Sequence, residues 1–442
     1  MKRLVAGCVA LLVAGAAGVQ AQPAAAPAAA TPLTLLDALS LALKANAGVA
    51  RARAEVAAAD AQRKTALSFI LPRVTATGSL VRNSKEVSFG SSDDRRVILP
   101  QNDWKGQLTL SQPVFAGLRE KRAYDQAKEG VVGARAGVTT AEDRVLLRVA
   151  SEYVDVAVAE AILDVEQETL RLAQKRRKQA QDLYEAGETT RVDVLRADTA
   201  IKASERRIAQ SRRDRETAVG QLRVELALDG DIRIDAPGMQ VPGLPPEAEL
   251  VARAEEGRSD LKQARSALSV ASIEVQKQKG AYLPVITADA GYIRQKTGFP
   301  TDRYGYAALR FTVPLFQAGE IGARVAQAGE RERQAQLAYE EARRSVREDV
   351  RRALLDARTA ATELALSQEQ LSAAEAEYSQ VFEQYRNQEV TSLDVAASEN
   401  TLADARRAVA SDRLNQQLSE LGVWYAVGGL SSAVRKLEEV RP

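Results

Sequence analysis

The chain has 442 residues, with 61 basic and 59 acidic side chains, no histidine and one cysteine, Cys8. Because histidine is both the commonest general base and the commonest metal ligand, we expect no Ser-His-Asp hydrolase, no metal site and no other cofactor. A formal net charge of +2 gives no long-range attraction to nucleic acid, so we expect neither an enzyme nor a nucleic-acid-binding protein.

Residues 1–21 have the order of a secretory signal peptide. Two basic residues precede an apolar stretch from 4 to 19, and the small-residue site Val19-Gln20-Ala21 follows. A lipoprotein site at Cys8 is the alternative, but only residues 4–7 precede that cysteine, and a signal peptide has an apolar region of about 7–15 residues. Cleavage after Ala21 would leave an Ala/Pro-rich segment at 22–32 and no later run of 18 apolar residues. We therefore expect an exported chain that can cross a membrane only with strands.

The folded part is predicted to begin with a helix at about 33–69, followed by strands at about 73–84 and 103–113. Proline is then absent from 114 to 236, an interval rich in good helix formers. Because an interior proline costs a helix about 3 kcal/mol, this interval predicts one helix from 119 to 187, roughly 100 Å long. A turn at 187–191 and a return helix at about 192–228 follow.

Apolar residues cover more than one face of the long helix, which predicts neighbours on both of its sides. Leu147, Val154 and Ala161 recur every seven residues, and a second apolar spacing runs beside them. The remaining charged side chains are interpreted as solvated helix surface, namely Glu166, Glu168, Arg171, Lys175 and Arg176.

After a connector at 229–246 the same order of elements returns. Residues 107–115 and 184–194 recur at 308–316 and 385–395, each 201 positions later, which predicts duplication of a whole unit. The first unit covers 33–228. The second covers 247–432, with a helix at 247–280, strands at 284–294 and 304–314, a long helix at 321–386, a tip at 387–391 and a return helix from 393; a tail at 433–442 ends the chain. We expect the first return helix to continue end to end into 247–280, and the second into 33–69 by closure of a ring.

The four strands alternate apolar and polar residues, as strands between lipid and water do. The alternative is a half-buried strand of a soluble sheet, but export and the polar loops at 83–102 and 295–303 favour a membrane. Four strands cannot close a barrel, because an open edge in lipid leaves unpaired backbone groups and single-chain barrels start at about eight strands. The chain must therefore assemble with copies of itself. The residues predicted to face lipid are Val74, Leu80, Trp104, Leu108, Leu110, Ile286, Tyr292, Leu309 and Phe311.

The order, duplication and spacing of these motifs resemble the TolC family of outer-membrane efflux proteins, over about 33–430. The resemblance implies an α+β membrane protein in which a trimeric 12-stranded outer-membrane β-barrel, four strands per chain, continues into a long periplasmic α-helical barrel. It is carried by the hairpin turns at 184–194 and 385–395 and by the predicted strand-to-helix turns, which contain Pro72, Pro113, Phe115, Pro284, Pro314 and Phe316.

The resemblance also implies a periplasmic aperture formed by Tyr385, Asp394 and Asp193, with hairpin tips that contact an adaptor. Three positions depart from the family pattern: Ala397 replaces a carboxylate, Val390 a basic residue and Gln388 a turn glycine. Stabilisation of helix N-termini is the alternative role of the two aspartates. The predicted adaptor-contact residues are Gly187, Glu188, Thr189, Thr190, Gln388, Glu389, Val390 and Thr391.

The function implied is an outer-membrane exit duct, with a periplasmic extension, that passes small toxic molecules such as drugs or metals to the exterior. Its partners would be two further copies, outer-membrane lipid, a periplasmic adaptor (membrane fusion) protein and an inner-membrane pump. Type I protein secretion is one alternative, and a soluble periplasmic coiled-coil adaptor is another. The residues do not decide among transported substrates.

Overall fold

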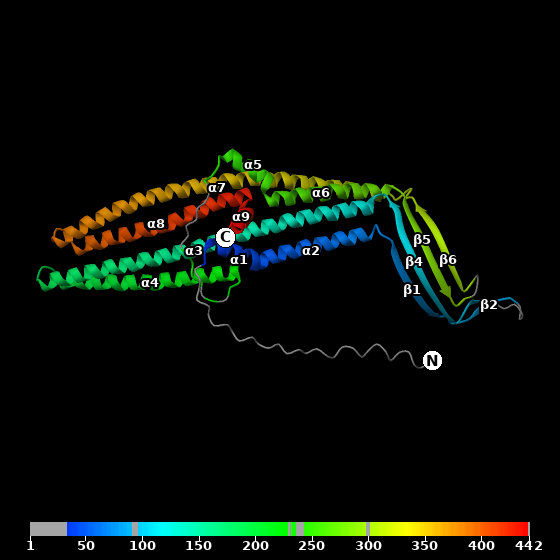
Figure 1. The fold of residues 1–442 in the computed structure, drawn as a ribbon, viewed down its shortest axis with the longest axis horizontal. Coiled ribbons are helices and arrows are strands. Elements are labelled where there is room, and N and C mark those ends of the chain that lie inside the picture. The colour runs from blue at the N-terminus through cyan, green and yellow to red at the C-terminus, as the bar shows by residue number, and fades with distance from the viewer. Residues whose placement is uncertain are drawn as a thin grey trace, which may run out of the picture.

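The computed structural model describes residues 33–90, 96–228, 230, 232–235, 243–297 and 301–440. The expected signal peptide, Cys8 and the segment 22–32 lie outside the described residues, as does part of the connector. The molecule is elongated, with a long layer of helices that carries a four-stranded sheet at one end and two helical hairpin tips at the other (Figure 1). No helix within the described ranges is long and apolar enough to span a membrane.

Two very long helices, α3 (Arg119–Glu185) and α7 (Glu320–Arg386), run the length of the layer. Each has 67 residues, about 100 Å of helix, and occupies an interval without proline. Each turns back into a 36-residue helix, α4 (Arg191–Leu226) or α8 (Ser392–Val427). The equal lengths in both halves follow from the duplication.

The shorter helices fill the rest of the layer. They are α1 (Leu35–Ala45), α2 (Ala47–Ser68), α5 (Glu247–Gly257), α6 (Ser259–Lys279), the 3₁₀ helix η1 (Gly280–Tyr282) and α9 (Leu430–Val440). The helices predicted at 33–69 and 247–280 are each broken in two. Asn46 leaves the helical conformation and caps α2 by accepting a 2.8 Å bond from the Gly48 N–H, and Arg258 interrupts the second helix with a ψ of 127°. The tail expected at 433–442 lies largely within α9.

The expected end-to-end partners of the return helices are wrong. The amide of Asn46 donates to the Glu225 carbonyl at 3.2 Å, so α2 continues the column of α4. The guanidinium of Arg258 donates to the Ala426 carbonyl at 3.4 Å, so α6 continues the column of α8 (Figure 1). A connector of 18 residues (229–246) can span about 60 Å. It is therefore long enough to carry the chain past α3 from one column to the other, and neither stack requires closure of a ring.

The largest core cluster lies at mid-length, where α1, α4 and α9 pack on α3. Tyr153 of α3 is fully buried there, and its hydroxyl lies between the carbonyl oxygens of Leu33 at 3.0 Å and Asp235 at 2.5 Å. Burial raises the pKa of Tyr153 to about 12. Leu33 also forms a parallel β-bridge with Ile234, so this cluster ties the connector to the start of the first unit.

The sheet has the order β1-β4-β5-β6, and all neighbours are antiparallel. Its strands are β1 (Arg73–Arg82), β4 (Asn102–Ala116), β5 (Val285–Gln295) and β6 (Arg303–Thr312). A separate hairpin, β2 (Val87–Phe89) with β3 (Arg96–Leu99), extends the connection between β1 and β4 and was not predicted. Each edge strand, β1 and β6, has one hydrogen-bonded neighbour among the described strands.

Candidate functional site

One face of the sheet carries all nine residues predicted to face lipid. Directly opposed residues of an antiparallel sheet share a face, and the register pairs Val74 with Leu110, Leu80 with Trp104, Leu108 with Tyr292, and Ile286 with Phe311. Leu309 lies opposite Ala288 on the same face. Ile286 is half-buried, and the other eight are exposed, from 38% for Trp104 to 88% for Leu80. A continuous apolar surface therefore lies uncovered within one chain.

The opposite face of the sheet is polar. The Ser111 hydroxyl donates to the Asp289 carboxylate at 2.7 Å, and Arg310 lies 3.7 Å from the same carboxylate. The Gln107 amide donates to the hydroxyls of Thr109 at 3.0 Å and Tyr306 at 3.4 Å. Such side chains suit contact with water.

The predicted strand-to-helix turns are only partly where they were placed. Pro72, Pro284, Pro314 and Phe316 lie between a helix and a strand, but Pro113 and Phe115 lie inside β4, opposite Thr287 and Ile286. The register shifts between these two residues, and a bulge is where a strand accepts proline. The real turn follows at Gly117. A Cβ there would lie 2.0 Å from the Gly280 carbonyl oxygen, so only glycine allows the turn before α3 to lie against the end of α6.

Each hairpin tip uses a left-handed residue, followed by a threonine that begins the return helix. Gly187 has a φ of +77° in the first tip, and Gln388 has a φ of +64° in the second. Asp193 accepts hydrogen bonds from the hydroxyls of Thr189 at 2.8 Å and Thr190 at 3.1 Å. Residues that were predicted to contact an adaptor therefore also form the turn within each hairpin tip.

Asp394 closes a capping box with Thr391 at the start of α8. It accepts the Thr391 backbone N–H at 2.8 Å and hydroxyl at 2.6 Å. These bonds, the side-chain one first, hold the pKa of Asp394 below its usual value. The contacts found for this residue are those of the helix-stabilising alternative.

The two tips are joined by Asp193 and not by Asp394. The hydroxyl of Ser392 donates to Asp193, and the Gln388 amide donates to the Glu188 carboxylate at 2.6 Å. The Ser392 hydrogen bond is the main cause that lowers the pKa of Asp193, against the opposing effect of partial burial. Ser392 was missed because a serine that begins a helix gives no sign of a partner 199 positions away.

Tyr385 lies beside this junction but does not hydrogen bond to it. Its ring packs with Leu183, Phe382 and Val395, and its hydroxyl is buried without a hydrogen-bond partner among the described residues. Burial, followed by the charge of Asp193, raises the pKa of Tyr385. Tyr385, Asp193 and Ser392 line one groove of about 290 Å³ between the hairpins. The structure therefore brings two of the three predicted aperture residues together and leaves Asp394 outside.

A buried ion pair lies above the tips, and the sequence interpretation of its basic member was wrong. Arg176 of α3 lies 2.9 Å from Glu399 of α8, and the two side chains are only 5% and 6% exposed. Burial raises the pKa of Glu399 although the positive charge of Arg176 opposes it. Arg176 is not solvated, because α8 packs on the face of α3 that carries it.

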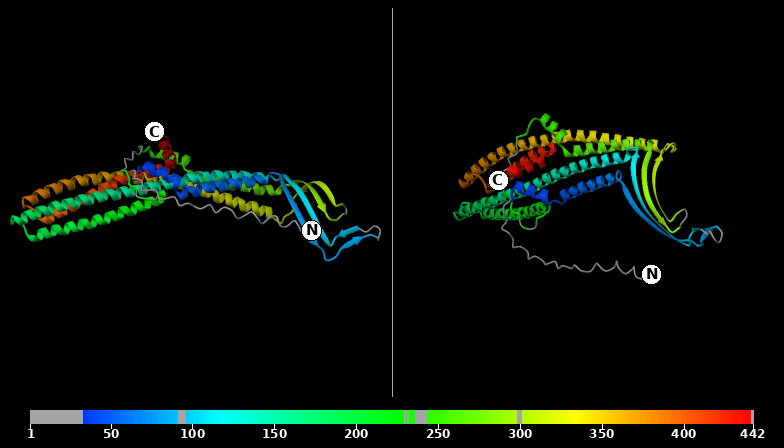
Figure 2. Two further views of the ribbon diagram at one scale, coloured as in Figure 1. Left: turned by 60° about the horizontal axis from the view of Figure 1, so that its bottom comes forward. Right: turned by 45° about the vertical axis from the view of Figure 1, so that its right-hand side comes forward.

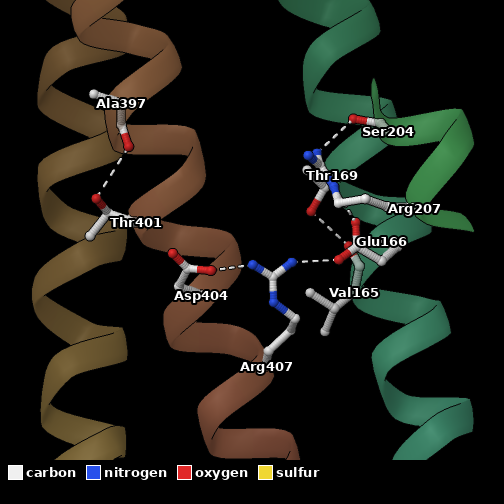
Figure 3. A network of polar contacts seen from close by, with 9 residues as sticks. All are labelled: Val165, Glu166, Thr169, Ser204, Arg207, Ala397, Thr401, Asp404 and Arg407. Carbon is white, nitrogen blue, oxygen red and sulfur yellow. Dashed lines mark hydrogen bonds and ion pairs between the residues drawn. The ribbon is translucent and has the colours of Figure 1, made fainter. Parts of the chain in front are cut away.

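Glu166 was also expected in solvent and is buried at the centre of a second network (Figure 3). Arg207 of α4 donates to it at 3.0 Å and to the Ser204 hydroxyl at 3.0 Å. Arg407 of α8 reaches Glu166 from the other side and also contacts Asp404. This network joins α3, α4 and α8 and, with the Arg176–Glu399 pair, fixes one hairpin against the other.

A family model described as outer membrane efflux protein matches residues 38–227 and 250–429 of the chain. Among curated proteins, the outer membrane efflux protein BepC of Brucella suis is 23% identical over 408 residues, 90% of this chain and 86% of that protein. The probable efflux pump outer membrane protein TtgC of Pseudomonas putida is 23% identical over 383 residues, covering 84% of this chain and 77% of that one.

A relative named for secretion also matches. The alkaline protease secretion protein AprF of Pseudomonas aeruginosa is 24% identical over 316 residues, 68% of this chain and 64% of that protein. Among solved structures, CusC superposes with a TM-score of 0.78 at 19% identity, covering 89% of this chain and 91% of that one. The fold is therefore that of this class of channel.

Proposed function

Because the chain belongs to the outer membrane efflux protein family, we propose that it forms the exit duct of a tripartite export system. It is an outer-membrane protein with a periplasmic helical extension. In the proposed assembly, three copies form the duct, a periplasmic adaptor contacts the hairpin tips, and an inner-membrane pump supplies the cargo.

The observation that carries the proposal is the sheet with one uncovered apolar face and two open edges. In lipid, an edge with unpaired N–H and C=O groups costs several kcal/mol for each group. Strand β6 of one copy can pair with β1 of the next, and three copies then supply 12 strands, above the smallest barrel of about eight. The number of copies, three, is taken from the family and does not follow from the open edges of the sheet.

The helical layer supports the same assembly. Helix α3 packs against α2, α4, α6 and α8, whereas α7 packs against α5, α6 and α8 and has a free side. Leu337, Leu355 and Leu366 of α7 are 55%, 63% and 60% exposed in the single chain. Burial of these side chains against a neighbouring copy would remove apolar surface from water.

At the periplasmic mouth, the groove lined by Tyr385, Asp193 and Ser392 supports a closed aperture in which hydrogen bonds hold the hairpins together. The tips at 187–190 and 388–391 are the proposed adaptor contacts. Val390 and Ala397 supply no charge, so Asp193, which is hydrogen bonded across the two hairpins, is the proposed acidic residue of the aperture.

The membrane part of the proposal is tested with two neighbouring residues of β4. Leu108→Lys places a charge on the apolar face, whereas Thr109→Lys places the same charge on the polar face. A lysine facing lipid at the bilayer midplane costs about 2–4 kcal/mol. We expect Leu108→Lys to reduce the heat-sensitive oligomer in outer-membrane fractions, and Thr109→Lys to leave it intact. Equal recovery of both variants, or recovery of the parent as a soluble periplasmic monomer, would reject the proposal.

The cargo is proposed to be small toxic molecules, because BepC and TtgC carry names of efflux proteins. The similarity to AprF favours protein secretion as a second candidate. A deletion strain tested against a panel of toxic compounds separates the two. Increased susceptibility supports efflux, and unchanged susceptibility with loss of an extracellular protein supports secretion.

A further inference from the structure

A groove of about 990 Å³ lies at mid-length of the molecule, away from both the sheet and the hairpin tips. It is lined by α3, α5, α6, by the end of α8 and by the start of α9. The left view of Figure 2 shows α5 and α9 projecting from the same side of the helical layer. In the proposed duct this side is the outer, periplasmic one, since both helices would otherwise obstruct the passage. We call this feature the α5–α9 groove.

Three cations line the α5–α9 groove and form no ion pair with a described residue: Arg135 of α3, and Lys262 and Arg265 of α6. Two glycines of α3 show that these cations lie at the same height along the two helices. A Cβ on Gly133 would meet the Ser266 hydroxyl at 2.9 Å, and a Cβ on Gly137 would meet the Gln263 amide at 3.2 Å. Arg135 therefore lies level with residues 263–266 of the facing helix, beside the other two cations.

Among the acids at the groove, Glu129 lines it without an ion pair to a described residue, whereas two neighbouring acids are engaged. Asp143 accepts the Ser431 backbone N–H at 2.8 Å, and Glu142 contacts both Arg53 and Arg435. The fourth cation of the lining, Arg253, is paired with Glu249 at 2.5 Å. Three unpaired cations against the single carboxylate of Glu129 thus leave a net positive charge in the groove, although the protein as a whole is close to neutral.

The lining also offers neutral donors and an apolar wall. Ser259 and Ser269 supply hydroxyls, and Val132 and Val427 supply apolar surface. Trp424 lines the groove as well, and its buried indole N–H has no hydrogen-bond acceptor among the described residues. A single small anion would use only part of these groups. A peptide that carries carboxylates at intervals, with polar backbone groups and apolar side-chain atoms between them, uses all of them.

The trimer proposed above leaves the α5–α9 groove uncovered. In the half of the helical layer next to the sheet, α3 and α6 lie between α2 and α7. Neighbouring copies would meet along α2, α4 and α7, whereas the groove lies between α3 and α6. We propose that the α5–α9 groove binds an acidic peptide segment of a periplasmic partner protein, through Arg135, Lys262 and Arg265.

The test uses the purified full-length protein with Trp104→Phe, which leaves Trp424 as the only tryptophan. The probe is a blocked pentapeptide with three glutamates alternating with alanines, and the control peptide has glutamines in place of the glutamates. We expect saturable quenching or enhancement of Trp424 fluorescence by the acidic peptide alone. Each exposed ion pair contributes only a few-fold in affinity. The combined variant Arg135→Gln, Lys262→Gln and Arg265→Gln should therefore bind about tenfold more weakly.

The matched control removes three other exposed cations, by Lys178→Gln, Arg206→Gln and Arg212→Gln, and should bind as the parent does. If the combined groove variant does not fold, the three single variants decide, each with binding about two- to threefold weaker. Unchanged binding in the groove variants, binding of the glutamine peptide, or stronger effects of inorganic phosphate or anionic lipid vesicles would overturn the proposal. Because the assay needs no transport, its failure leaves the duct proposal intact, and a soluble monomer that binds the peptide would reject the duct alone.

Discussion

The buried pair Arg176–Glu399 gives the sharpest prediction about the contact between the two hairpins. The two side chains are only 5% and 6% exposed. Glu399→Gln therefore leaves the Arg176 guanidinium buried without a counter-charge. Two unit charges about 4 Å apart attract by about 4 kcal/mol at an effective dielectric constant of 20. Loss of one partner of a buried pair costs about 3–5 kcal/mol. We therefore expect local stability between α3 and α8 to fall by about 3 kcal/mol.

The measurement is amide hydrogen exchange of purified protein in the segments around Arg176 and Glu399. A loss of about 3 kcal/mol corresponds to at least a 100-fold faster exchange, since about 1.4 kcal/mol is a factor of ten. Arg176→Met alone should act similarly by leaving Glu399 unpaired. The double variant should lose much less than the sum of the two, because neither charge then remains buried alone.

Tyr378→Phe is the matched control, because the Tyr378 hydroxyl is buried nearby without a hydrogen-bond partner among the described residues. Its removal should leave exchange unchanged or slower. Additive losses in the double variant, or a single Glu399→Gln variant that exchanges like the parent, would refute the reasoning that the pair is a coupled, desolvated contact.

Three further predictions concern single positions. Gln388→Gly should be about 1 kcal/mol more stable in local hydrogen exchange than Gln388→Ala, since both lose the side-chain bond but only glycine relieves the positive φ; equal exchange would contradict this. Burial, and then Glu225, raises the pKa of Glu152 to about 7, so its charged form destabilises the fold above that pH and the penalty fades toward pH 4.5. Glu152→Gln should therefore raise thermal stability at pH 8 by about 1 kcal/mol, a value reduced for screening by solvent. At pH 4.5 the substitution should leave stability unchanged, and an equal gain at both pH values would contradict the prediction. Ser392→Ala removes the bond to Asp193 and should weaken tip closure by about 1 kcal/mol, seen as a roughly fivefold longer open time in planar bilayers, whereas unchanged gating would assign closure elsewhere.

Features that lie within one element could be predicted from local sequence. The length of α3 follows from an interval without proline, and the shared face of Leu108 and Leu110 follows from the period of two in a strand. The duplication, read from recurring motifs, predicted equal hairpins in both halves. The short hairpin β2–β3 was missed because its strands have three and four residues, too few for a clear alternation. The break at Arg258 was missed although Gly257 ends α5 directly before it, because a single glycine within a helical interval is tolerated.

The sequence by itself determined the two long helices with their return helices, the four strands of the sheet, the apolar face of that sheet and, through resemblance, the family. Only the tertiary structure decided which short helix continues which return helix, because an 18-residue connector permits either column. It also decided that Arg176 and Glu166 are buried and that Ser392 holds Asp193. Helices with apolar residues on several faces do not reveal which face meets a neighbour. The partner that buries a charge can lie more than 200 positions away, so its burial depends on packing that no local pattern records.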